Sequence, residues 1–255
     1  MADTACYSGR MNRAVRMGLS LSLGAGGLTA LGAYAVAGKS SQVFGPSVYR
    51  GPGHRRSVAL TFDDGPSGGS LRLLEYLELH GVKATFFQCG RNVERHPEIS
   101  RGIYAAGHEI GNHTYSHPQL CPGIGREMSW RSPSFIYKEL ELTQAILRSE
   151  VGTTPGLVRA PYGLRWFGIG AAQARLHLLG VMWTVIGNDW KLPADLICRR
   201  VLRRTSPGGI ICLHDGRDIQ PNPDVSEMLL AVQEIVPRLQ DQGYGFETVS
   251  ELLKA

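Results

Sequence analysis

The chain has 255 residues, of which 43% are hydrophobic, and its formal net charge is +5 at pH 7. This length and composition allow one sizeable core in a single α/β domain of about 200 residues. Seven of the 27 basic residues but only one of the 22 acidic residues lie in residues 1–57, so residues 58–255 carry 20 basic and 21 acidic residues. This nearly neutral body excludes a basic nucleic-acid groove, and we expect no nucleic-acid partner.

The first 38 residues have the features of an export signal or of an N-terminal anchor. Three arginines precede an apolar stretch from residue 17 to residue 38, and Ala35-Val36-Ala37 supplies the small residues of a cleavage site. The stretch is long enough to span a bilayer, but its five glycines between residues 18 and 32 disfavour an anchor helix. We expect cleavage after Ala37 and an exported protein (periplasmic, in the cell envelope or secreted), with membrane attachment only through residues 17–38.

Residues 39–57, which are rich in Gly, Pro and Ser, are interpreted as a linker, and residues 58–255 as the folded domain. The five cysteines show no C-x-x-C spacing, which argues against a zinc ribbon or a redox motif. They are Cys6, Cys89, Cys121, Cys198 and Cys212. An exported location permits a disulfide among the last four, but their spacing selects no pair.

From residue 58 onward, strand-like runs alternate with helical patterns. Strands are expected at 58–62, 84–87, 109–112, 157–159, 181–186, 210–213 and 246–249. Helices are expected after an N-cap at Ser70, from Pro97, from Ser132-Pro133, and over an apolar pattern from Val225 to Leu239. Such alternation predicts a parallel sheet, either closed into a barrel or open and doubly wound. Short strands, with polar motifs at their carboxyl ends, favour a distorted (β/α)7 barrel.

Two adjacent carboxylates, Asp63 and Asp64, follow the first predicted strand. Buried side by side they would repel each other unless a cation lay between them, and a strand end directs neighbouring side chains differently. His113 and His117 follow the third predicted strand at a spacing that brings both imidazoles to one side. One aspartate with two histidines forms a three-ligand metal site with an open position, which leaves the other aspartate as a general base. Taken singly, the two motifs are also typical of a turn and of an exposed face.

Three further segments follow the later strands in chain order. They are Arg159-Ala160-Pro161-Tyr162-Gly163, the run from Trp183 to Trp190, and Ile210-Ile211-Cys212-Leu213-His214-Asp215-Gly216. With the first two motifs, these segments make residues 57–252 resemble the polysaccharide deacetylase family, also called the NodB homology domain or carbohydrate esterase family 4. Residues 58–255 are accordingly interpreted as a NodB-like domain.

The resemblance implies a role for each matching residue. Asp63 matches the general base of the family, and Arg159 matches the arginine that braces it. Asp64, His113 and His117 match the metal ligands. Ligands of this type favour zinc in the first instance, with cobalt, nickel or iron as alternatives.

The later motifs imply the acid and the substrate pocket. His214 matches the catalytic histidine, and Asp189 matches the carboxylate that tunes it. Tyr162 matches the residue whose backbone N–H helps to hold the oxyanion, while Trp190 and Leu213 match the lining of the acetyl pocket.

Two positions depart from the family pattern. Ile186 stands where many relatives carry an aspartate, and Cys212 replaces the usual leucine two residues before the histidine. Trp183 is expected in the core rather than in the site. The segment 119–131 is expected either to form a wall of a substrate groove or to be an irregular surface loop.

The expected function is removal of N-acetyl groups from N-acetylglucosamine-containing glycans, either chitooligosaccharide or peptidoglycan. An acetyl esterase acting on xylan is one alternative, because the same chemistry cleaves an ester. A glycan-binding domain that has lost catalysis is the other, and the presence of both Asp63 and His214 argues against it.

Overall fold

The structure is a computed structural model that describes residues 29–122 and 131–254. Its nine-stranded sheet follows the order β1-β6-β5-β4-β3-β2-β8-β7, with β9 paired to the start of β2. The strands are β1 (Ser47–Val48), β2 (Ser57–Asp63), β3 (Thr85–Gln88), β4 (Glu109–Asn112), β5 (Leu157–Val158), β6 (Leu179–Val181), β7 (Val185–Ile186), β8 (Gly209–His214) and β9 (Gly245–Phe246). All strand pairs named in this sheet are parallel. The predicted distorted barrel is confirmed, and it stays open between the two ends of this order.

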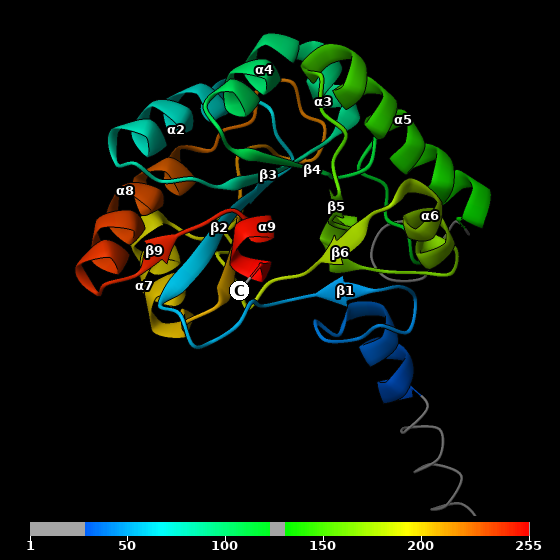
Figure 1. The fold of residues 1–255 in the computed structure, drawn as a ribbon, viewed down its shortest axis with the longest axis horizontal. Helices are drawn as coiled ribbons and strands as arrows, with labels where there is room; N and C mark the ends of the chain where they lie inside the picture. The colour runs from blue at the N-terminus through cyan, green and yellow to red at the C-terminus, as the bar shows by residue number, and fades with distance from the viewer. Residues whose placement is uncertain (1–28, 123–130, 255) are drawn as a thin grey trace, which may run out of the picture.

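Most helices pack around the outside of the curled sheet, whereas the last one, α9, lies within its curl, where Val249 and Leu252 pack against Ala59 and Ile210 (Figure 1). The labelled helices are α2 (Gly68–Leu79), α3 (Gly90–Arg95), α4 (Pro97–Ala105), α5 (Pro133–Val151), the short helix η1 (Pro161–Gly163), α6 (Ile169–Leu176), α7 (Ala194–Arg204), α8 (Ser226–Asp241) and α9 (Val249–Leu253). Residues 29–37 are also helical. The largest core cluster lies between β2, β3 and β8 and the apolar faces of α2 and α8. All seven residues of β2 are buried, as expected for the central strand of a parallel sheet.

Three local predictions differ from the structure. The N-cap of α2 is Ser67, not Ser70; Ser70 instead closes a capping box by accepting the Ser67 backbone N–H at 2.9 Å. The predicted strand 181–186 divides into β6 and β7, because the chain leaves the β5 side of the sheet and re-enters beside β8. The last predicted strand, 246–249, is shorter, since α9 already begins at Val249.

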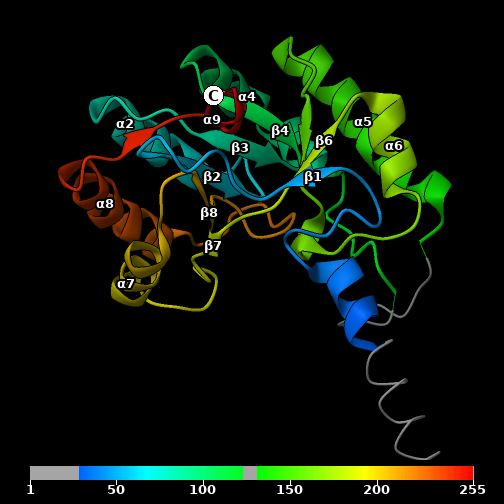
Figure 2. The same ribbon diagram turned by 60° about the horizontal axis from the view of Figure 1, so that its bottom comes forward.

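Residues 39–57 are not a linker throughout. They contain β1, which extends the sheet by pairing with β6. The residues just before β1 are also bonded to the domain. The buried Arg165 donates to the carbonyls of Gly38 and Ser41, so this segment is held by backbone acceptors that its composition does not reveal. Figure 2 shows the segment passing along one side of the sheet.

Most of the apolar N-terminal stretch lies outside the described residues, as do residues 123–130 of the predicted loop. Within residues 29–122 and 131–254, no helix is both long enough and apolar enough to cross a bilayer. The cleavage and export predictions remain predictions.

Candidate active site

The two neighbouring aspartates separate at the carboxyl end of β2. Asp63 is the last residue of the strand, and Asp64 turns away from it with a left-handed φ of 72°. The Oδ1 atom of Asp63 accepts a 2.7 Å hydrogen bond from Arg159 Nη1, and its Oδ2 lies 3.4 Å from the thiol of Cys212. The buried guanidinium therefore holds the Asp63 side chain in place at the wall of the pocket.

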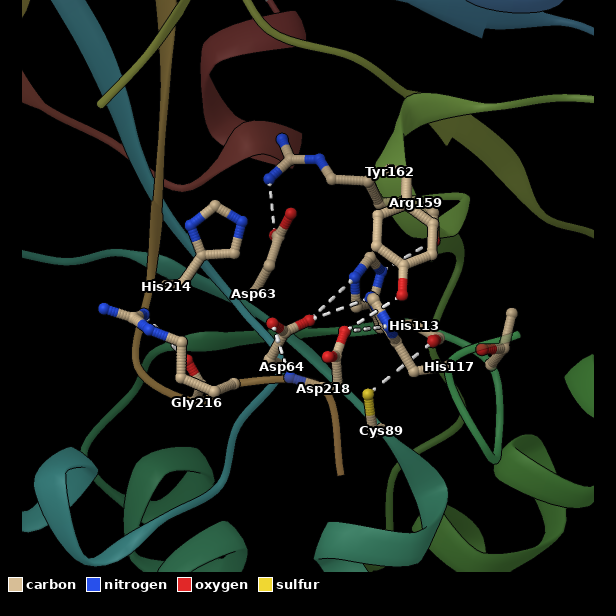
Figure 3. A network of polar contacts seen from close by, with 12 residues as sticks. Asp63, Asp64, Cys89, His113, His117, Arg159, Tyr162, His214, Gly216 and Asp218 are labelled. Atoms are coloured by element: carbon tan, nitrogen blue, oxygen red, sulfur yellow. Dashed lines mark hydrogen bonds and ion pairs between the residues drawn. The ribbon is translucent and has the colours of Figure 1, made fainter. Parts of the chain in front are cut away.

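Asp64 faces the two histidines instead. Its Oδ1 lies 3.2 Å from His113 Nε2 and 3.1 Å from His117 Nε2 (Figure 3). This buried oxygen accepts no hydrogen bond from the described part of the chain. An unsatisfied carboxylate oxygen between two imidazole nitrogens fits a divalent cation, and the three residues form a cluster with metal-ligand spacing.

The outer nitrogens of the two histidines are also held. His113 Nδ1 lies 2.8 Å from the backbone carbonyl oxygen of Arg159, and His117 Nδ1 lies 2.7 Å from Asp218 Oδ1. Partners of this kind orient a metal-binding imidazole and direct its Nε2 lone pair inward. Burial lowers the pKa of His117, but the carboxylates of Asp64 and Asp218 outweigh burial and raise it to about 10. The pocket wall thus favours a positive charge where a cation would bind.

Asp218 belongs to the site although no sequence motif points to it. Its backbone N–H donates to Asp64 Oδ2 at 3.0 Å, and its carboxylate accepts from the Tyr162 hydroxyl at 3.1 Å. Asn92 connects the two aspartates by donating to both of their backbone carbonyls. The short distance of Asp218 from the motif ending in Gly216 is the only sequence signal for it.

His214 stands on the other side of Asp63, at the end of β8 (Figure 3). Its Nδ1 lies 2.9 Å from Asp189 Oδ1, and its backbone N–H donates to Asp189 Oδ2 at 2.8 Å. Burial lowers the pKa of His214, but the Asp189 carboxylate outweighs it and raises that pKa to about 9. The imidazole is therefore charged at neutral pH and can serve as a general acid.

The chain resembles known proteins in both sequence and fold. Residues 50–176 match the model of the polysaccharide deacetylase family. A peptidoglycan-N-acetylglucosamine deacetylase of Bacillus cereus is 35% identical over 81% of this chain and 71% of its own length. A chitooligosaccharide deacetylase of a Bradyrhizobium strain is 34% identical over 77% of this chain and 90% of its own length. The chain belongs to the polysaccharide deacetylase family.

A comparison with a solved structure supports the same family. The crystal structure of the peptidoglycan N-acetylglucosamine deacetylase Bc1960 superposes with a TM-score of 0.72 at 33% identity, covering 81% of this chain and 92% of that one. The similarity therefore extends over most of both chains rather than over the motifs alone.

A pocket of about 420 Å³ lies in front of these groups in this polysaccharide deacetylase family member. Seven of the ten residues singled out from the sequence line it: Asp63, Asp64, His113, His117, Tyr162, Trp190 and His214. Arg159 and Asp189 lie behind the pocket and hold Asp63 and His214 in place. The tenth residue, Leu213, is placed differently from the prediction.

Leu213 is fully buried in the main core and is not among the residues that line the pocket. It precedes His214 on β8, and successive strand residues point to opposite faces. The apolar lining comes instead from Trp190, Ile186 and Trp183. Trp183, which was expected in the core rather than in the site, packs against a core cluster and also lines the pocket. Arg217 and Gln220 complete the wall, and Arg217 donates to the Asp189 backbone carbonyl at 2.8 Å.

Backbone strain gathers around the same pocket. Four residues that line it have positive φ although they are not glycine: Asp64, His117, Tyr162 and Asp218. Each such residue costs on the order of 1–3 kcal/mol and persists only where its surroundings hold it. The fold thus trades stability for the orientation of these side chains.

Proposed function

We propose that this protein is a metal-dependent hydrolase that removes N-acetyl groups from N-acetylglucosamine-containing glycans. One observation carries the proposal: the cluster of Asp64, His113 and His117 faces the same pocket as Asp63 and His214. A metal-ligand set, a further carboxylate and a charged imidazole around one cavity are what amide hydrolysis requires. Relatives named as deacetylases of peptidoglycan and of chitooligosaccharide support the substrate class.

The divalent ion, zinc in the first instance and cobalt, nickel or iron as alternatives, would be held by Asp64, His113 and His117. When bound, it would polarise the acetyl carbonyl and lower the pKa of a water molecule. Asp63, held in place by Arg159, takes a proton from the water whose oxygen attacks the carbonyl carbon. We place the backbone N–H of Tyr162, in η1 on the pocket wall, near the developing oxyanion.

His214 completes the reaction. The carbon–nitrogen bond breaks as His214 gives its proton to the leaving nitrogen, which yields acetate and a free amine. Asp189 keeps the imidazole charged beforehand and fixes the ring through Nδ1. The indole of Trp190 lies edge-to-face against the His214 ring at 5.1 Å and, with Ile186, forms an apolar wall for the acetyl methyl group.

Acetate release from a panel of substrates tests this function. The panel contains chitooligosaccharides, peptidoglycan and acetylxylan, each assayed with the metal-loaded protein and with Asp63→Asn. We expect acetate from the N-acetylglucosamine substrates and almost none from the variant. Release from acetylxylan alone would support the esterase, while glycan binding without any release would support a lapsed enzyme.

Peptidoglycan and chitooligosaccharide share the sugar that this pocket would accept. An exported protein meets peptidoglycan first, and we propose it as the physiological target, with chitooligosaccharides as the substrate that reports activity in solution. The export itself rests on the N-terminal sequence. Sequencing of the mature N-terminus checks it, since we expect a start shortly after Ala37.

A further inference from the structure

A second group of metal-ligating side chains lies at the edge of the same pocket: Asp63 and His214 line the pocket, and the buried thiol of Cys212 lies behind them. One ligand atom from each of Asp63, Cys212 and His214 lies within 4.8 Å of the other two. Cys212 and His214 are two residues apart on β8 and so share a face, and Asp63 pairs with His214 in the register of β2 and β8. None of these residues belongs to the cluster around Asp64.

The distance between Cys212 and Asp63 suits direct coordination of an ion by both. Cys212 Sγ lies 3.4 Å from Asp63 Oδ2, whereas a zinc ion bonded at about 2.3 Å to sulfur and about 2.1 Å to oxygen holds the two ligands roughly 3.5 Å apart. Arg159 donates to the other oxygen, Oδ1, so Oδ2 is the one directed at the thiol. His214 Nδ1 is engaged by Asp189, which leaves Nε2 for a ligand.

We propose that Asp63, Cys212 and His214 form a second, weaker cation site that takes thiophilic divalent ions such as Zn²⁺ or Cd²⁺ and thereby inhibits the enzyme. Thiolate, imidazole and carboxylate together favour these ions over magnesium or calcium. Binding requires the thiol and the imidazolium to release their protons to solvent. Burial raises the pKa of Cys212 well above its ordinary value, and the Arg159 guanidinium repels a cation, which makes this site the weaker one.

The inhibition rests on the proposed function, whereas the binding does not. An ion held here would occupy the oxygen of Asp63 that accepts a proton and the nitrogen of His214 that donates one. Excess zinc would therefore stop turnover even with the first cluster filled. A leucine at position 212 could not ligate, so the inhibition depends on the thiol that this chain carries there.

The test titrates the full-length wild-type protein with Cd²⁺ and Zn²⁺, following bound metal by equilibrium dialysis and the ultraviolet cadmium–thiolate absorption. We expect a second, weaker equivalent, with the absorption appearing as it binds and acetate release falling in parallel under zinc. Cys212→Ala and Cys212→Leu should lose the absorption and require at least tenfold more zinc for half-inhibition. Cys198→Ala, which removes a buried thiol of α7 away from the pocket, should behave as wild type.

Absence of the absorption, or equal zinc inhibition in wild type and both Cys212 variants, would overturn the proposal. If the protein released no acetate from any substrate, the proposed function would fail. Even then, the cadmium–thiolate absorption and the binding of a second equivalent of metal would still test whether the second cation site exists.

Discussion

The two ends of the parallel sheet use similar polar residues for opposite purposes. At the amino end, Glu109 accepts from the Thr85 hydroxyl at 2.8 Å and from the Ser250 hydroxyl and backbone N–H, so both of its carboxylate oxygens have partners. At the carboxyl end, Asp64 keeps a buried oxygen without a hydrogen bond between two imidazoles. Polar groups at the amino end satisfy one another and stabilise the fold, whereas the carboxyl end leaves this carboxylate oxygen without a hydrogen bond, as a ligand site requires.

Two histidines show the same contrast. His108, just before β4, accepts the Ala84 backbone N–H through Nδ1, and burial lowers its pKa to about 4. His214, at the end of β8, has a pKa raised to about 9 because Asp189 outweighs the effect of burial. One histidine is kept neutral for a structural hydrogen bond, and the other is kept charged for proton transfer.

The largest effect should come from the metal ligands. His113→Ala and His117→Ala should each lose most of the bound metal and nearly all acetate release, because two ligands hold a divalent ion far more weakly than three. Elemental analysis of the purified variants measures this. His108→Ala is the matched control from the other end of the sheet: it should lose stability but keep its metal. Full metal occupancy in both ligand variants would refute the assignment.

Asp63→Asn and His214→Ala should fold and keep the metal while kcat falls by roughly a hundred- to ten-thousand-fold, since each removes a proton-transfer group. Turnover assays at saturating metal, with circular dichroism as a check on folding, test this. Activity within a few-fold of wild type in either variant would contradict the mechanism.

Removing the partner of His117 should have an intermediate effect. Asp218→Asn should weaken metal affinity by roughly ten- to a hundred-fold, because His117 loses the carboxylate that orients its ring. A competitive chelator titration measures the affinity. Asp224→Asn, in the same connection, serves as the control because Asp224 accepts the Ser226 backbone N–H, and the substitution should leave the affinity unchanged.

The pH profile should depend on Asp189. Since the pKa of His214 is raised to about 9, kcat should hold to about that pH and fall above it as the imidazolium is lost. Asp189→Asn removes the main cause of the increase, so its alkaline limb should move to lower pH, with at least about tenfold less activity at pH 8. If the alkaline limb of the profile stayed unchanged in Asp189→Asn, a group other than His214 would cause the fall in kcat.

The smallest expected effect on activity comes from His108 at the amino end, which makes the stability of the protein depend on pH instead. The pKa of His108 is about 4 in the folded protein, below its ordinary 6.5, so its contribution is complete above pH 6.5 and is lost as the pH falls towards 4. The loss amounts to on the order of 3 kcal/mol. Urea unfolding at pH 7 and pH 4.5 should show it in wild type, and His108→Asn should show less of the difference.

Much of this molecule follows from local sequence. The alternation of strands and helices predicts a parallel sheet, and the carboxyl ends of parallel strands meet at one edge. For this reason the sequence alone predicts that Asp63 and Asp64 after β2, His113 and His117 after β4, and His214 at the end of β8 lie together. The resemblance to the family adds a role for each, and the described geometry brings the same residues around one pocket.

Only the tertiary structure decided the remaining features, because they depend on contacts between distant segments. Asp218 becomes a partner of His117 through the path of a loop that has no motif of its own. Leu213 is withdrawn into the core by strand alternation, while Trp183 reaches the pocket because the run from Leu179 to Ile186 divides between two parts of the sheet. The same packing places the Cys212 thiol against Asp63, a contact that no spacing along the chain predicts.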